Sequence, residues 1–134
     1  MTDCLFCKII SGEIPCYKIF ENDYCLAFLD ISKDCYGHTL VIPKVHCDSI
    51  FDCEPYILAE TIKTTQSICK HFKSLGFDGA NIINNNGASA EQSIHHLHFH
   101  IYPRKENDGI KITPVIESKN LDLESIQKFL FKKS

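Results

Sequence analysis

The chain has 134 residues, a formal net charge of −3 and 23% charged residues, which fits one globular domain. A pI near 6.1 argues against non-specific nucleic-acid binding, which requires a basic face. The sequence has no apolar run near the ~18 residues that span a bilayer. Its first residues also lack the charged-then-apolar layout of a secretory signal. We therefore expect one cytoplasmic domain over residues 1–134, with neither nucleic acid nor membrane as a partner.

Short strand-like segments recur along the chain and are separated by turn residues. The segment 12–15 is typical of a turn, and the gap at 21–23 suits a hairpin between the first two strands. Pro43 ends the third strand because proline cannot donate a hydrogen bond in a central ladder. Five strands are predicted, at residues 17–20, 24–30, 38–42, 81–84 and 94–103.

One long helical pattern runs from Pro55 to Leu75, and Gly76 follows its end. Its apolar positions fall near one face and predict the buried side: Leu58, Ile62, Cys69, Phe72 and Leu75. A short terminal helix is indicated by Leu123, Ile126 and Leu130, whereas Pro114 weakens an extended segment at 110–116. Because strands and helices do not alternate as in βαβ units, we predict an α+β fold with an antiparallel sheet.

Four of the seven histidines lie between positions 95 and 100. In this stretch His96, His98 and His100 alternate with Leu97, Phe99 and Ile101. A strand points successive side chains to opposite faces, so the three imidazoles are expected to share one face. The apolar face can enter the core, which leaves a row of nitrogen bases on the other side. His95 is expected to point away from that row.

The eight cysteines include one CxxC pair, Cys4 and Cys7. Without an export signal, free thiols are expected rather than a disulfide framework. CxxC also serves redox enzymes, but there it follows a strand in a βαβ setting, which this sequence lacks. Structural zinc needs four ligands, and His46 together with one histidine of the 94–103 strand are the candidates for the other two. The residues alone leave a zinc site and two unrelated thiols as equal alternatives.

Segment 96–102 resembles the signature of the histidine triad family, in which three histidines alternate with apolar residues. Further family blocks stand in family order at residues 4–10, 27–32, 37–44, 85–87 and 92–93. The resemblance spans residues 4–104 and leaves 105–134 as a variable C-terminal tail. It implies a five-stranded antiparallel sheet with one long helix and short terminal helices, and a homodimer. His100 stands where the nucleotidyltransferase branch carries glutamine, which favours the nucleotide hydrolases.

The resemblance also indicates a metal site. Zinc-carrying family members use the CxxC pair, the histidine after Pro-Lys-x and the first triad histidine. These positions correspond here to Cys4, Cys7, His46 and His96. Such a closed four-ligand site is structural and leaves no open position for metal catalysis, so no catalytic metal is expected.

For the chemistry, the resemblance makes His98 the nucleophile, because a neutral imidazole offers a bare nitrogen near pH 7. Attack on the α-phosphorus of a purine nucleoside phosphoramidate or a related nucleotide conjugate would give a nucleotidyl-His98 intermediate that water cleaves. The main-chain carbonyl of His96 is expected to hold the required tautomer. His100 and His38 would stabilise phosphate charge, and Ser93 would help the leaving group acquire a proton.

The remaining contacts with substrate follow from the same resemblance. Asp30 would accept hydrogen bonds from the ribose hydroxyls. The base pocket and the phosphate contacts are expected to come from Phe6, Phe28, Ile31, Asn85 and Gln92, together with Ser93, His98 and His100. Taken singly, these are ordinary residues: Phe28 and Ile31 would be core in any fold, Asp30 a strand end, and Asn85 a turn residue.

Three other interpretations stay open. The protein could hydrolyse dinucleoside polyphosphates, since these present the same α-phosphate to His98. It could bind a nucleotide without turnover, although a pure binder does not need a nucleophile. A metalloenzyme could direct His96, His98 and His100 at one catalytic metal, but the CxxC pair and His46 compete for His96. The tail lacks the tryptophan of the phosphoramidase branch, so the leaving group is not fixed.

Overall fold

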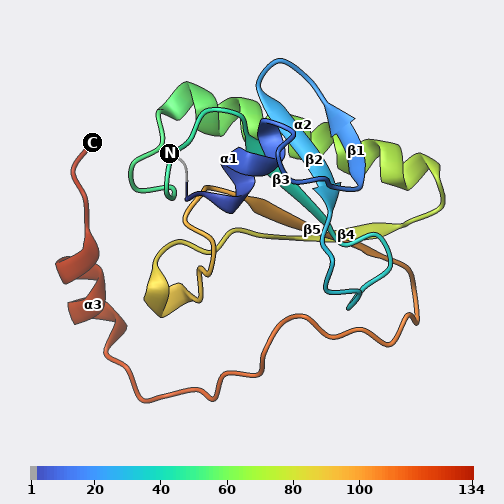
Figure 1. Cartoon of the computed structure of the whole chain (residues 1–134). Coiled ribbons are helices and arrows are strands. Elements are labelled where there is room, and N and C mark those ends of the chain that lie inside the picture. The colour runs from blue at the N-terminus through green and yellow to red at the C-terminus, as the bar shows by residue number, and fades with distance from the viewer. Residues whose placement is uncertain (1–2) are drawn as a thin grey trace.

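The computed structural model describes residues 3–134 and contains, within that range, one five-stranded sheet and three α-helices (Figure 1). The strands are β1 (Lys18–Glu21), β2 (Cys25–Leu29), β3 (Thr39–Pro43), β4 (Gly79–Ile83) and β5 (Phe99–Arg104). The helices are α1 (Leu5–Ile10), α2 (Pro55–Ser74) and α3 (Leu123–Leu130), with a 3-10 turn at Ala88–Ala90. The predicted α+β class and the five antiparallel strands are confirmed.

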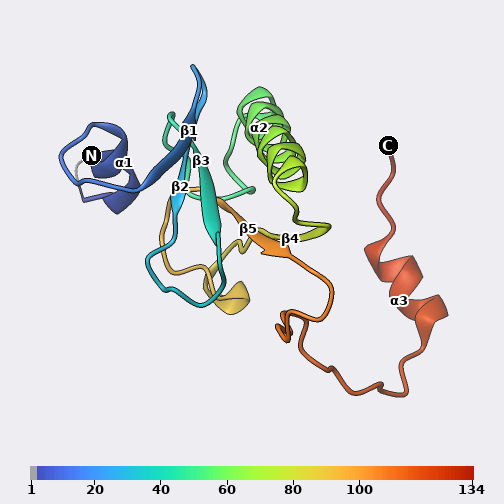
Figure 2. The same ribbon diagram turned by 90° about the vertical axis from the view of Figure 1, so that its right-hand side faces the viewer.

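The sheet order is β1-β2-β3-β5-β4, and each neighbouring pair is antiparallel. A helix covers each face, α2 on one side and α1 on the other (Figure 2). Alternation along the strands divides the core accordingly: Cys25, Ala27, Val41 and Ile101 pack against Ile68 and Phe72 of α2. Leu26, Phe28, Leu40 and Ile42 pack against Phe6 of α1 on the other side. Because both faces are covered, β2 and β3 are buried along nearly their whole length, whereas β5 alternates between buried and partly exposed residues.

The buried face of α2 differs from the predicted one. The helix buries Ile57, Thr61, Thr64, Thr65, Ile68 and Phe72, whereas Ile62 and Leu75 are 43% and 60% exposed. The threonine hydroxyls satisfy themselves within the helix: Thr61 donates to the carbonyl of Ile57 at 2.7 Å, and Thr65 to that of Thr61 at 2.8 Å. A hydroxyl bonded in this way can enter a core, so a pattern that counts threonine as polar places the buried face too far round the helix. Phe72 is buried as predicted, and Leu58 and Cys69 pack against the core in part.

The histidine-rich strand is shorter than predicted. β5 begins at Phe99, and residues 94–96 form a bend that precedes it. Of the three triad histidines only His100 lies within β5. The rings of His96 and His98 nevertheless both meet the ring of Phe6 edge-on, at centroid distances of 5.8 and 5.2 Å. The apolar partners do enter the core, since Leu97 and Ile101 are fully buried. Leu97 is held by a main-chain bond to the carbonyl of Cys47 at 2.8 Å instead of by the sheet.

The C-terminal tail leaves the sheet after Arg104 and carries α3 away from the other elements in both views (Figures 1 and 2). The terminal helix is confirmed, and Asp122 caps its first turn by accepting from the backbone N–H groups of Glu124 and Ser125. Residues 110–116 belong to none of the strands of the described chain. No helix within residues 3–134 has the length and apolar character that crossing a bilayer requires.

Candidate functional site

His98 and His100 lie on the α1 face of the sheet. His100 is directly opposite Leu40 of β3, and residues directly opposite in an antiparallel pair share a face. Leu40 packs in the same cluster as Phe6 of α1. The ring of Phe6 meets the ring of His98 edge-on at a centroid distance of 5.2 Å. The first helix thus forms a wall beside the second triad histidine.

The imidazole of His98 is fixed in one tautomer. Its Nδ1 donates to the main-chain carbonyl of His96 at 2.7 Å, so Nε2 carries the lone pair. Within residues 3–134, no polar side-chain atom is both buried and without a hydrogen-bond partner. Nε2 accepts no bond in that range, and it therefore reaches solvent even though the residue is only 5% exposed. Burial lowers the pKa of His98, which keeps the ring neutral near pH 7.

His100 pairs with His38, the residue that precedes β3. Nδ1 of His100 and Nε2 of His38 are 2.9 Å apart, a hydrogen bond that holds one proton between the rings. Burial, followed by the neighbouring His98 and His38, lowers the pKa of His100 to about 4. His38 is placed by Gly37, whose φ of 82° suits glycine and where a Cβ would lie 3.1 Å from Pro103 Cγ.

Asp34 also belongs to this group, although no pattern in the sequence indicates it. Its Oδ1 accepts from Nδ1 of His38 at 2.8 Å. The two residues are four apart in an irregular loop, where no helical or strand period predicts a contact. Asn84 was missed for the same reason: its Nδ2 donates to the carbonyl of His98 at 2.9 Å and anchors the strand from the β4 side.

The residues expected to hold the nucleoside surround the same face. Asp30 lies at the end of β2; one carboxylate oxygen accepts from the backbone N–H of Ser32 at 2.7 Å, and the other is 3.9 Å from Nε2 of His38. Phe28 is buried beside Phe6, as a core residue is. Ile31, by contrast, is 80% exposed, so it is not core and its side chain is free to contact a ligand.

The polar residues predicted to contact the phosphate, which lie before the histidines in the chain, are not gathered in one cavity. Asn85 and His100 line one cavity of about 630 Å³, and Ser93 lines another of about 670 Å³. Gln92 is buried, and both amide hydrogens are used, on the carbonyls of Asp48 and Ile94 at 2.6 and 2.9 Å. Its oxygen accepts from the backbone N–H of Gly87 at 2.8 Å. In this conformation Gln92 shapes the loop, and its predicted contact with substrate stays untested.

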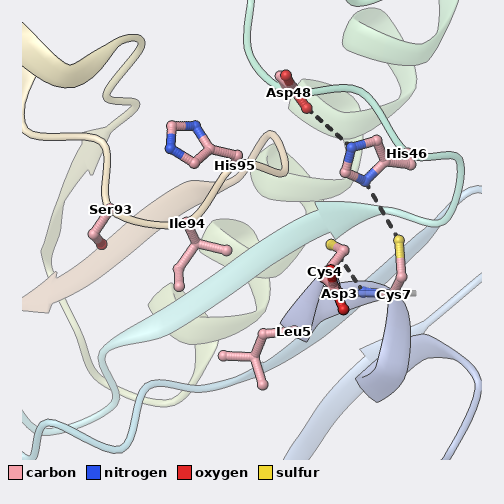
Figure 3. Close-up of a pocket in the computed structure, with 9 residues that line it drawn as sticks. All are labelled: Asp3, Cys4, Leu5, Cys7, His46, Asp48, Ser93, Ile94 and His95. Carbon is pink, nitrogen blue, oxygen red and sulfur yellow. Dashed lines mark hydrogen bonds and ion pairs between the residues drawn. The ribbon is translucent and has the colours of Figure 1, made fainter. Parts of the chain in front are cut away.

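The four residues predicted to bind metal come together in one group. Three of them, Cys4, Cys7 and His46, line the cavity of about 670 Å³ (Figure 3). Nδ1 of His96 lies 3.3 Å from Cys4 Sγ, 3.6 Å from Cys7 Sγ and 3.1 Å from Nδ1 of His46. Nδ1 of His46 is 3.4 Å from Cys7 Sγ. A tetrahedron with zinc bond lengths separates its ligand atoms by roughly 3.3–3.8 Å, so the donor set fits a zinc ion. This cluster joins α1, the loop after β3 and the bend before β5.

The two histidines of the cluster are also held in the tautomer that a metal needs. Nε2 of His96 donates to the carbonyl of Pro43 at 2.8 Å, and Nε2 of His46 lies 3.0 Å from Asp48 Oδ1. Each bond keeps the proton on Nε2 and leaves Nδ1 as the ligand atom. Because all four donors are protein atoms, the geometry is that of a closed site.

Within residues 3–134, the remaining histidines and cysteines contribute no ligand atom to this cluster. His95 is exposed and, with Ser93 and Ile94, faces Cys4 and Cys7 across the cavity (Figure 3). His71 is exposed on α2. All eight cysteines are free thiols, in agreement with the expectation from the sequence.

Comparison with known proteins identifies relatives whose sequences align with most of this chain. An uncharacterized HIT-like protein of Methanocaldococcus jannaschii is 46% identical across 93% of this chain and 96% of the relative. An adenylylsulfatase of Arabidopsis thaliana is 41% identical across 91% of this chain and 62% of its own length. An adenosine 5′-monophosphoramidase of Saccharomyces cerevisiae is 39% identical across 77% of this chain and 63% of its own length.

Solved structures share the fold. A HIT family protein of Bacillus anthracis superposes with a TM-score of 0.82 and 41% identity, covering 96% of this chain and 92% of that one. A zinc-bound histidine triad family protein of Mycobacterium smegmatis superposes with a TM-score of 0.79 and 36% identity, covering 86% of this chain and 84% of that one. The HIT domain profile matches residues 11–107. The chain belongs to the histidine triad (HIT) family.

Proposed function

We propose that this protein hydrolyses purine nucleoside phosphoramidates and related adenylyl conjugates at the α-phosphorus, with His98 as the nucleophile. The bond between Nδ1 of His98 and the His96 carbonyl supports the proposal most strongly, because it leaves a neutral, solvent-accessible Nε2. The names of two relatives agree with it: an adenylylsulfatase and an adenosine 5′-monophosphoramidase differ in leaving group and share the adenylyl group.

The reaction has two steps. In the first, Nε2 of His98 forms a bond to the α-phosphorus while the bond from phosphorus to the leaving nitrogen breaks. Ser93 assists the transfer of a proton to the departing amine. The product is an N-phosphoryl imidazolium whose Nδ1–H still donates to the His96 carbonyl, and its positive charge makes His98 a good leaving group.

In the second step, water attacks the same phosphorus and the bond to His98 breaks. The water releases a proton to solvent, which replaces the solvent proton that the departing amine took in the first step. A nucleoside monophosphate leaves, and His98 returns to its neutral form. His100 and His38 stabilise the charge on the non-bridging oxygens when phosphorus is five-coordinate. Asp30 and Ile31 take the ribose and one face of the base.

We further propose that Cys4, Cys7, His46 and His96 hold a structural zinc. The ligand spacing, the two hydrogen-bonded Nε2 atoms and the zinc-bound relative support this assignment. A bound zinc would supply tertiary stability by tying α1 to the sheet. Because the site is closed, a zinc ion held there would take no direct part in the hydrolysis.

Hydrolysis of adenosine 5′-phosphoramidate by the zinc-loaded protein tests the proposed activity. We expect AMP to form, and expect His98→Ala to lose at least about a thousandfold in kcat/KM while its zinc content and circular dichroism stay unchanged. His95→Ala, which changes an exposed neighbour, is the matched control and should retain activity. Turnover in His98→Ala at the wild-type rate would remove the nucleophile from the scheme.

A panel with a dinucleoside polyphosphate as second substrate separates the alternatives. Faster cleavage of that compound than of the phosphoramidate would identify a dinucleoside polyphosphate hydrolase. Tight binding of AMP without cleavage of either substrate would identify a binding protein.

A further inference from the structure

Asp34 lies in the loop between β2 and β3 and contacts His38 from the solvent side. Its side chain is 49% exposed, whereas His38, which it bonds, is 4% exposed. The Oδ1–Nδ1 distance of 2.8 Å joins Asp34 to His38, and the 2.9 Å bond beyond joins His38 to His100. These contacts form a continuous chain from a surface carboxylate through two imidazoles, which we name the Asp34–His38–His100 chain.

Proton counting along this chain restricts His38. An ionised carboxylate can only accept, so Nδ1 of His38 must carry a proton. Partial burial acts to raise the pKa of Asp34, but hydrogen bonds from His38 and Ser32 outweigh it and lower that pKa, which keeps the carboxylate ionised. The variable proton of His38 is therefore the one on Nε2, the nitrogen that faces His100.

Two arrangements remain for the second bond. If His38 is neutral, its Nε2 is bare, His100 donates from Nδ1, and the outer nitrogen of His100 can only accept. If His38 is protonated, it donates to Nδ1 of His100, and Nε2 of His100 carries a proton that it can donate to a phosphoryl oxygen. Only the second arrangement suits a residue that binds a phosphate.

Carboxylates lie on both sides of the His38 ring. Oδ1 of Asp34 is 2.8 Å from Nδ1, and Oδ2 of Asp30 is 3.9 Å from Nε2, so two carboxylates flank the ring. The other polar or titratable groups that face it are Ser32 of the loop and His100 and Tyr102 of β5, with Tyr102 stacked at a centroid distance of 4.0 Å. His98 reaches it only through His100, at a centroid distance of 5.0 Å from that ring.

We propose that Asp34 is a positioning residue for the hydrolysis, acting through His38 to give His100 an Nε2 proton directed at the substrate phosphate. The inference rests on the proposed function and adds to it a requirement for one more proton in the site. Asp34 lies in a loop, so its charge can be removed without changing any of the three triad histidines.

Asp34→Asn and Asp34→Ala separate charge from acceptor. Asparagine keeps an oxygen for Nδ1 of His38 but removes the charge, so we expect kcat/KM for adenosine 5′-phosphoramidate to fall about tenfold to a hundredfold at pH 8 and less at pH 6. The alkaline limb of the pH profile should move to lower pH. Asp34→Ala should move the alkaline limb in the same direction and lower kcat/KM further. Asp34→Glu, which keeps the charge, should bring the limb part of the way back to its wild-type position.

Asp23→Asn is the matched control, because Asp23 is exposed in the turn between β1 and β2 and the substitution changes net charge equally. Its pH profile should coincide with that of the wild type. A merely structural role for Asp34 would lower activity evenly across pH, and that result, or an unchanged profile in Asp34→Asn, would overturn the proposal.

The ring nitrogens of His38 give a readout that does not depend on turnover. Correlation of ring carbon protons with ¹⁵N in the zinc-loaded protein should show both ring nitrogens of His38 protonated in the wild type and a neutral ring in Asp34→Ala. A bare Nε2 of His38 in the wild type would overturn the proposal even if the enzyme is active. If the wild type cleaves no adenylyl substrate, the proposed function fails, whereas the histidine spectrum still decides the role of Asp34.

Discussion

His98 and His95 are three positions apart and differ in every property that matters for catalysis. His98 is buried and bonded to a main-chain carbonyl, whereas His95 is exposed. The alternation of residues 96–101 predicts which face each imidazole takes, but it does not predict the carbonyl that fixes the tautomer. That expectation came from the resemblance alone, and the distance of 2.7 Å now supports it. The catalytic roles themselves stay predictions.

Three polar residues show where prediction from sequence ends. Asp34 and Asn84 make bonds that no local period signals, because their partners are set by loop conformation. Gln92 stands in a family block, and yet both of its amide hydrogens are bonded to backbone carbonyls. Chain order identifies such residues as present near a site. Only the folded geometry shows which atoms they leave available.

Burial of His100 links stability to pH. Its folded pKa of about 4 lies below the ordinary value of 6.5, so the unfolded chain binds the proton more tightly. This group's contribution is fully present above pH 6.5 and is lost as pH falls toward about 4. From pH 7 to pH 5, the free energy of unfolding should fall by about 1–2 kcal/mol more in the wild type than in His100→Gln.

Urea titrations of both proteins at the two pH values measure that difference. His71→Gln, at an exposed position of α2, is the control and should lose stability in parallel with the wild type. Equal losses in wild type and His100→Gln would show that the imidazole of His100 is not buried in its neutral form.

Among the elements, the positions of the strands were predicted well. For the long helix, the sequence predicts where it begins and ends but not which face is buried. β2 and β3 are apolar on both faces and are bounded by turns, so their positions follow from the sequence. The orientation of α2 does not, because Thr61 and Thr65 enter the core with their hydroxyls bonded to the helix backbone. The start of β5 was predicted too early for a different reason. Polar and apolar residues alternate from His96, within the bend at 94–96, but the main chain there is not paired with a neighbouring strand.

Two isoleucines of α2 test its orientation. Ile68 is 3% exposed in the cluster beneath the sheet, and Ile62 is 43% exposed. Ile68→Ala should lower the free energy of unfolding by about 2–5 kcal/mol because it leaves a cavity. Ile62→Ala should cost less than about 1 kcal/mol. Chemical denaturation at constant pH measures both, and a larger loss in Ile62→Ala would mean that the helix is rotated.

The metal cluster connects three elements that the sheet does not hold together: α1, the loop after β3 and the bend before β5. Cys7→Ser should reduce zinc from one per chain to nearly none and lower the thermal midpoint by several degrees, because serine is a poor zinc ligand. Cys69→Ser, on α2, is the control and should keep its zinc. Elemental analysis of the purified proteins decides the matter: full zinc content in Cys7→Ser would contradict the assigned ligand set.

For the whole molecule, the family resemblance leads us to expect a homodimer. The described chain presents β4 at the edge of its sheet and largely exposed apolar side chains in its tail, among them Val115, Leu123 and Phe129. Light scattering coupled to gel filtration should give twice the 15.3 kDa of one chain at micromolar concentration. A mass of one chain over that range would exclude a stable dimer.

The proposed reaction requires a covalent bond between His98 and the nucleotide. Rapid mixing with adenosine 5′-phosphoramidate, acid quenching and mass spectrometry of the denatured protein detect that bond directly. We predict an adenylyl addition that peptide mapping places on His98, that appears before AMP and that decays as AMP accumulates. AMP released in a single turnover with no addition, or an addition on another residue, would contradict it.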